Sequence, residues 1–417
     1  MSTPIPGTQR IESLDLIRGF AVCGLVAING IEFGLGTVPL VYPLDFDGGD
    51  RALWTLVMGL GCGKFVTLFA TLFGAGMILF TERAELSGQS AASVYLPRLG
   101  WLLLFGNLHA YLLWHGDILV TYAVTGFVLF WCRNWSAKVF AIVGSVLFAL
   151  FVLPLYAGAL IAQFIDFEEV FDNESLREEA ANIMELIRDE EATETAALTG
   201  TWIEQMKVRS LYVVVTHFFG IPLYLFWFAA MNMSFGMALM KSGFFRGEWS
   251  GERIRKWTGL FLVVGLPLTL GGYGIFSFAD PSPAPFLWAY AALLTGLPLV
   301  AFGYAGSLMM WSQRGEPGFL RRGFTAVGRM AFTNYICQSV ILSLIYYGHG
   351  LGLRGRLDFS EAMLIVPVVW VVQMVLSVWW LKRFRFGPLE WLWRWLTYGH
   401  SSLKKRTAPP QLPSENG

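Results

Sequence analysis

The sequence predicts an all-α membrane protein, a polytopic bundle of about ten transmembrane helices with both termini in the cytoplasm. Three observations predict this class. Of the 417 residues, 55% are hydrophobic and only 14% are charged. Apolar runs of about 20 residues, the length that crosses the hydrocarbon core, recur along the chain. Lysine and arginine gather in alternate loops. A single helical bundle is therefore expected rather than several soluble domains.

The apolar runs place five spans before a long polar insertion and five after it. The predicted spans are residues 16–34, 65–80, 96–114, 118–131, 137–164, 211–240, 257–276, 285–311, 324–347 and 362–381. A shorter helical piece, residues 52–61, precedes the second span. An amphipathic piece, residues 388–399, is expected to lie in the membrane interface with its tryptophans in the headgroup layer.

Four regions follow from this division of the chain. They are an N-terminal five-span half (1–164), an acidic insertion (165–210), a C-terminal five-span half with the interfacial helix (211–400) and a disordered tail (401–417). No cleavable signal pattern opens the sequence, because the first apolar run is too long and no A-x-A site follows it.

The distribution of basic residues predicts the orientation. Most of the 30 lysine and arginine residues fall in loops on the same side as the N-terminus. The positive-inside rule therefore places both termini in the cytoplasm, and the even number of spans agrees with that. The acidic insertion then lies outside, either as a solvated cap without function or with a role of its own.

Residues 97–126 are the most informative stretch for function. Two apolar segments flank the polar hinge His115-Gly116-Asp117, and His109 lies inside the first segment. Ionisable groups at membrane depth are costly and usually face a bundle interior or a water-filled cavity. We therefore predict a catalytic group of His109, Asp117 and His115. The alternative, strongest for His115, is a position in the headgroup zone.

Other polar side chains are expected near the same outer face, namely His217, His349, Glu32, Asp45, Asp47 and Asp50. Imidazole can take and return a proton near neutral pH, so His217 and His349 are candidates for a substrate path. The sequence contains no H-E-x-x-H zinc motif, G-x-S-x-G elbow or phosphate-binding P-loop. Its four cysteines are isolated in apolar segments, so we expect neither a metal site nor a disulfide.

At the inner face, Arg18, Arg98 and Arg329 each lie where a span begins. Such residues commonly anchor a helix by extending their charged ends to the interface. The sharper hypothesis is that they bind the phosphates of a nucleotide-bearing donor.

Three amides, Asn29, Asn334 and Gln338, lie within predicted spans. They are candidates for lining the substrate path or for stabilising an oxyanion. Interhelical hydrogen bonding is the commoner role of such amides in membranes.

Several motifs spread over nearly the whole chain resemble the YeiB-like family of bacterial multi-pass membrane proteins. They are RIESLDLIRGFAVCGLVAING (10–30), F-x-TLFATLFGAGM (65–77), R-L-x5-F-G-x2-H (98–109), G-D-I-L-x2-Y-A (116–123), GRMAFTNYICQS (328–339), GLGL (350–353) and GPLEWLWR (387–394). The C-terminal half resembles the family's domain of unknown function. The resemblance implies a location in the bacterial plasma or inner membrane.

The N-terminal half is similar, more distantly, to the transmembrane acyltransferase superfamily that includes the lysosomal heparan glucosaminide acetyltransferases. That similarity implies a histidine on the non-cytosolic side and an acyl-CoA donor that enters from the cytosol. It matches Arg18-Gly19 to the R-G of the first span, His109 to the histidine and Gly116-Asp117 to the hinge. His115 departs from the family, which often has an aromatic residue there.

Two classes of function remain open. An acyltransferase would move an acyl group from cytosolic acyl-CoA, used as a substrate rather than a tightly bound cofactor, to an extracytoplasmic hydroxyl or amine. His109 would be its general base, and Asp117 would orient the imidazole. A transporter would bind a small molecule near mid-membrane and use His109 and Asp117 as a proton relay. The expected partners are the bilayer and a small-molecule, glycan or lipid acceptor, with no nucleic acid; a homo-oligomer is compatible with the sequence.

The predicted topology can be tested by labelling single cysteines in intact cells with an impermeant maleimide. In a cysteine-free background, we expect a cysteine at position 185, in the acidic insertion, to be labelled. A cysteine at position 405, in the C-terminal tail, should react only after the cells are permeabilised. The reverse pattern would show that the orientation is inverted.

Overall fold

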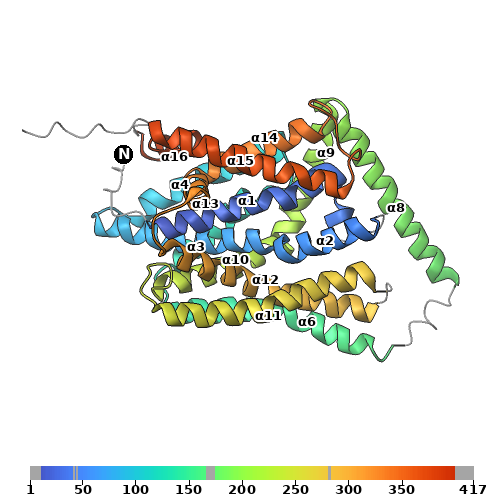
Figure 1. Ribbon diagram of the computed structural model, residues 1–417, viewed down its shortest axis with the longest axis horizontal. Helices are drawn as coiled ribbons and strands as arrows, with labels where there is room; N and C mark the ends of the chain where they lie inside the picture. Colours follow the sequence, from blue (N-terminus) through green and yellow to red (C-terminus); the bar gives the residue numbers. More distant parts are fainter. Residues whose placement is uncertain (1–10, 41–42, 44–45, 166–173, 280–282, 400–417) are drawn as a thin grey trace, which may run out of the picture.

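The computed structural model describes residues 11–40, 43, 46–165, 174–279 and 283–399, and these residues form helices and no β-strand (Figure 1). In chain order the helices are α1 (Glu12–Leu35), η1 (Val38–Leu40), α2 (Gly48–Gly61), α3 (Lys64–Leu86), α4 (Ala91–Leu112), α5 (Leu119–Cys132), α6 (Ala137–Ala162), α8 (Glu174–Thr199), α9 (Trp202–Val215), η2 (Thr216–Leu225), α10 (Phe226–Lys241), α11 (Gly251–Phe278), α12 (Pro283–Ser312), α13 (Phe319–Arg329), α14 (Ala331–Tyr346), α15 (Phe359–Arg383) and α16 (Pro388–Tyr398). The predicted all-α class is confirmed.

Seven helices of the described chain are long and apolar enough to cross a membrane. They are residues 12–35, 48–86, 137–162, 202–241, 251–278, 283–312 and 359–383. The apolar helices α5 and α14 are shorter. The chain is therefore a multi-pass membrane protein, while the count of about ten spans stays a prediction.

Helix α1 lies at the centre of the bundle, with α13, α14 and α15 on one side and α3 on the other (Figure 1). In its most apolar stretch 72% of the residues are buried, compared with 17% in α6. The apolar side chains of α6 thus face outward, as expected for a helix in contact with lipid. Helices α8 and α16 lie at opposite ends of the bundle.

Two predicted spans differ from the observed helices. The span predicted at 324–347 is interrupted at Met330, where φ is −116° and ψ is 33°, so that α13 and α14 are separate. The span predicted at 211–240 belongs to one longer helix, 202–241, whose middle part, η2, is a π-helix containing Pro222. Proline lacks an N–H and clashes with the preceding turn, and a π-helical segment accommodates such an interruption.

The acidic insertion forms the 26-residue helix α8 and is tied to the bundle by a buried ion pair. Arg354 donates to Glu194 of α8 at 3.1 Å, and the two side chains are only 1% and 4% exposed. The same guanidinium donates to the carbonyls of Glu32 and Phe33 at 2.6 and 3.1 Å. These carbonyls belong to the last turn of α1, where a cation is favourable. Part of the insertion is therefore packed structure rather than a solvated cap.

Removing Arg354 should destabilise the protein. In Arg354→Met, Glu194 stays buried without its partner, which costs about 3–5 kcal/mol. We expect a clear fall in the unfolding midpoint of the detergent-solubilised protein. Arg356→Met, two residues away on an exposed side chain, is the matched control and should change the midpoint little. Equal midpoints for the two variants would contradict a stabilising role for the Arg354–Glu194 pair.

Candidate functional site

Three buried side chains from different parts of the chain form a hydrogen-bonded row. His109 of α4 contacts Asp117 through Nδ1 and Oδ2 at 2.7 Å. Its other ring nitrogen, Nε2, lies 2.8 Å from Oγ of Ser339 in α14. The exposed fractions of the three residues are 2%, 7% and 2%. The structure thus brings together two of the three predicted catalytic residues and adds a serine.

Asp117 is held in place by a second bond. Its Oδ1 accepts the backbone N–H of Val120 at 2.8 Å, at the start of α5, while Oδ2 faces His109. Gly106 of α4 makes room for this loop, since a Cβ there would lie 2.7 Å from the Val120 nitrogen and 2.9 Å from Oδ1 of Asp117. The F-G-x2-H and G-D-I-L motifs therefore form one packed unit.

For a neutral imidazole, the row sets the hydrogen-bond roles of the two ring nitrogens. An ionised Asp117 can only accept, so Nδ1 of His109 carries its hydrogen toward the carboxylate. Nε2 is then the acceptor for the hydroxyl of Ser339. This order of carboxylate, imidazole and hydroxyl is the arrangement in which a histidine removes a proton from a nucleophile.

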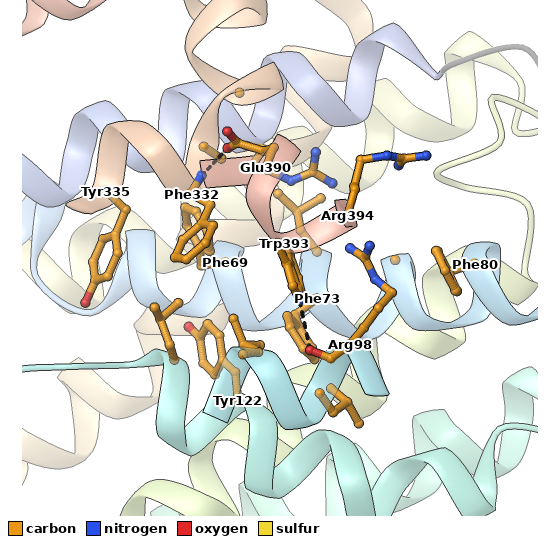
Figure 2. A pocket seen from close by; sticks show the side chains of 18 of the residues that line it. Phe69, Phe73, Phe80, Arg98, Tyr122, Phe332, Tyr335, Glu390, Trp393 and Arg394 are labelled. Carbon is orange, nitrogen blue, oxygen red and sulfur yellow. Dashed lines mark hydrogen bonds between the residues drawn. The ribbon is translucent and has the colours of Figure 1, made fainter. Parts of the chain in front are cut away.

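A cavity of about 370 Å³ is lined by five arginines and by Tyr335, the ring that contacts His109. We call it the central cavity; its apolar walls come from α3, α4, α5, α14 and α16 (Figure 2). The arginines that line it are Arg18, Arg83, Arg98, Arg329 and Arg394. Figure 2 shows Arg98 and Arg394 toward one side and Tyr335 at the other.

Tyr335 separates the central cavity from His109. Its ring lines the cavity, and its centroid lies 5.0 Å from that of the His109 ring. Ile118 and Leu119, which directly follow Asp117, line the same part of the cavity. The inner part of the cavity is therefore one side-chain layer away from the buried row.

Two of the predicted phosphate-binding residues reach the cavity because α1 and α13 cross closely. A Cβ on Gly19 would lie 1.7 Å from the carbonyl oxygen of Phe324, and one on Gly328 would lie 1.8 Å from that of Asp15. Only glycine permits backbones to approach this closely. The neighbouring side chains, Arg18 and Arg329, consequently line one cavity.

Arg98 is held between aromatic rings. Its guanidinium lies 4.0 Å from the centroid of Trp393 and 4.9 Å from that of Phe80. Trp393 also donates its indole N–H to the Arg98 carbonyl at 2.9 Å. Among the described residues, the buried Nη1 of Arg98 has no hydrogen-bond partner. A fixed, cationic donor group in a cavity is suited to an anion.

Helix α16 belongs to the wall of the cavity. Glu390 accepts the N–H groups of Phe332 and Thr333 at 2.7 and 3.1 Å and the Thr333 hydroxyl at 2.6 Å. These N–H groups begin α14 after the break at Met330, so the carboxylate replaces the missing helical acceptors. Burial raises the pKa of Glu390, and these hydrogen bonds oppose the shift.

The other predicted histidines lie apart from the row. His115 contacts Glu32 at 2.9 Å and stacks on Tyr212 at 4.8 Å. His217 packs edge-on against Tyr111, and Nδ1 of His349 lies 2.9 Å from the side-chain oxygen Oε1 of Gln205. Burial lowers the pKa of His349, and Arg209 lowers it further.

The predicted amides differ in their surroundings. Asn334 donates to Ser377 of α15 at 3.0 Å, and Gln338 donates to Gln373 of α15 at 2.9 Å and to the Val22 carbonyl at 3.0 Å. These bonds join helices in the apolar bundle. Asn29 is partly buried on α1.

Sequence reasoning missed Ser339, Tyr335, Trp393, Arg83 and Arg394. Ser339 closes the GRMAFTNYICQS motif, and Trp393 and Arg394 close GPLEWLWR. The motifs contain these residues, but serines and tryptophans are common in membrane helices. Only the fold shows that α14 and α16 face α4.

A multi-pass bundle with a buried polar row and an arginine-lined cavity defines a multi-pass membrane protein with a candidate functional site. The chain belongs to the YeiB-like family. It is 31% identical to "Uncharacterized protein YxaH" of Bacillus subtilis (strain 168), over 95% of this chain and 96% of the relative. It is 30% identical to "Uncharacterized protein YeiB" of Escherichia coli (strain K12), over 93% and 96%.

Two further comparisons agree with this placement. An "Uncharacterized 39.9 kDa protein in amylase 3'region" of Bacillus acidopullulyticus is 27% identical over 95% of the chain and 96% of the relative. Residues 239–400 match the family described as "Protein of unknown function (DUF418)". No solved structure gives a significant match.

Proposed function

We propose that this protein is an acyltransferase of the bacterial cell membrane. It takes an acyl group from cytosolic acyl-CoA and transfers it to a hydroxyl or amine on the opposite side. The observation that carries this proposal is the central cavity, which joins five arginines to the tyrosine in contact with His109. A cationic end followed by an apolar passage suits a donor with a phosphorylated head and an uncharged arm.

The dimensions support the same donor. Arg98 and His109 lie on one helix, eleven residues apart, which corresponds to about 16 Å along its axis. An extended pantetheine arm has a comparable length. A donor whose phosphates contact Arg98 and Arg18 would therefore place its thioester close to Tyr335 and the buried row.

The chemistry of the row supports acyl transfer. His109 accepts the proton of the attacking group at Nε2, and Asp117 orients the ring and stabilises the imidazolium that forms. The attacking atom forms a bond to the thioester carbonyl carbon, and the CoA thiolate leaves and is protonated by the imidazolium. A transporter with a His109–Asp117 proton relay is the alternative function.

Arg98→Lys should weaken acyl-CoA binding. Lysine keeps the charge but cannot make two parallel hydrogen bonds to a phosphate, nor stack its head group as a plane on Trp393. We expect the dissociation constant for acetyl-CoA or palmitoyl-CoA, measured by calorimetry on purified protein, to rise about tenfold.

Arg133→Lys is the matched control for Arg98→Lys. Arg133 also lies over an aromatic ring, 4.3 Å from the centroid of Phe130, but it does not line the central cavity. Its replacement should leave binding unchanged. If no acyl-CoA binds to the unmodified protein, while substrate-dependent flux occurs in proteoliposomes, the transporter function is correct instead.

Replacing His109, the proposed general base, should lower the rate of acyl transfer and leave the protein folded. We expect His109→Ala to insert into the membrane and to lower acyl transfer about a hundredfold or more. His400→Ala, predicted from sequence to lie at the opposite face, should have no effect. Transfer of labelled acyl groups from acyl-CoA by membranes measures the rate, and full activity of folded His109→Ala would contradict the assignment.

A further inference from the structure

We infer that Ser339 is the nucleophile of this reaction and carries the acyl group as a covalent ester between two half-reactions. The inference rests on the proposed function and adds a residue and an intermediate to it. Its first support is position: Oγ of Ser339 lies 2.8 Å from Nε2 of His109, whose Nδ1 faces Asp117 at 2.7 Å.

The hydrogen bonding of Ser339 differs from that of three other hydroxyls in apolar helices of this chain. Ser343, one turn later in α14, donates to the Val340 carbonyl, and Ser307 and Thr295 donate to the carbonyls four residues before them. Such bonds within a helix are the usual way to satisfy a buried hydroxyl. Ser339 is instead directed at the imidazole, where its proton can be removed.

The first half-reaction forms the ester. The Ser339 hydroxyl proton moves to Nε2 of His109 as Oγ bonds to the thioester carbonyl carbon. The carbon–sulfur bond then breaks, and the departing thiolate takes the proton from His109. Free CoA and acyl-Ser339 result, with no oxidation or reduction.

The second half-reaction reverses these roles. His109 removes the proton of the acceptor hydroxyl or amine, whose oxygen or nitrogen bonds to the ester carbonyl carbon. Oγ of Ser339 leaves and regains a proton from His109. The acceptor carries the acyl group, and the enzyme returns to its starting state.

A covalent intermediate fits a site that donor and acceptor approach from different ends. Arg98 and Arg394 lie toward one side of the central cavity, and Tyr335, whose ring contacts His109, lies at the other (Figure 2). Tyr335 and Ser339 are four residues apart and share a face of α14. The ring of Tyr335 must therefore move to admit the thioester. Because the ester outlasts the departure of CoA, the site never has to be open to both sides of the membrane at once.

The test is to mix purified protein with acetyl-CoA or palmitoyl-CoA without any acceptor and to quench it in acid. Peptide mass spectrometry should then find the acyl group on Ser339. In Ser339→Ala we expect at least about nine-tenths of this label to be lost and the turnover rate to fall about a thousandfold. Calorimetry should still detect acyl-CoA binding to this variant. Ser343→Ala, the matched control one turn away, should be labelled as the unmodified protein is.

Ser339→Cys keeps a nucleophile in the same place and is the control for a folding defect in Ser339→Ala. It should form a thioester, which neutral hydroxylamine cleaves, unlike the serine ester. Acyl transfer by Ser339→Ala within about threefold of the unmodified rate, or label on His109 instead, overturns the inference and leaves the acyltransferase function standing. If neither the unmodified protein nor any variant binds acyl-CoA, both the Ser339 intermediate and the acyltransferase function are overturned.

Discussion

The bond between His109 and Asp117 is the contact on which the rest of the site depends. A carboxylate placed in an apolar bundle is tolerated only if its oxygens find donors. Asp117 has two, the imidazole and the Val120 N–H. The first requires the end of α4 to face the start of α5, and the second fixes the loop between them. Gly106 removes the side chain that would otherwise keep the two apart.

Other buried polar side chains of the bundle also need hydrogen-bond partners, and they find them in a different way. Asn334 and Gln338 use the N–H groups of their amides to join α14 to α15 and to α1. Arg354 satisfies its guanidinium with Glu194 and the last carbonyls of α1. In these cases the hydrogen bonds hold parts of the bundle together. The His109 row instead ends at the Ser339 hydroxyl, which Tyr335 separates from the central cavity, and the acyl transfer proposed above uses this row.

The sequence predicted the features that depend on local pattern. Long apolar runs indicated the all-α membrane class, and the position of His109 and Asp117 within one short stretch, residues 97–126, indicated that they belong to one site. Arg18, Arg98 and Arg329 were predicted as one group from their positions where predicted spans begin, and they line one cavity. Ser339 lies 230 residues from His109 in the chain. The hydrophobic periodicity of a sequence does not show a contact across that separation. It does not show the break at Met330 either, after which Glu390 accepts the N–H groups of Phe332 and Thr333.

The place of α16 has an evolutionary consequence. This helix belongs to the region described as DUF418, yet Trp393 covers Arg98 of the N-terminal half and Arg394 lines the same cavity. The cavity therefore has no complete wall in either half alone. Gene fission or exchange of one half between relatives would separate the arginine from its tryptophan. Selection then acts on the two halves together, which agrees with relatives that match over nearly their whole length.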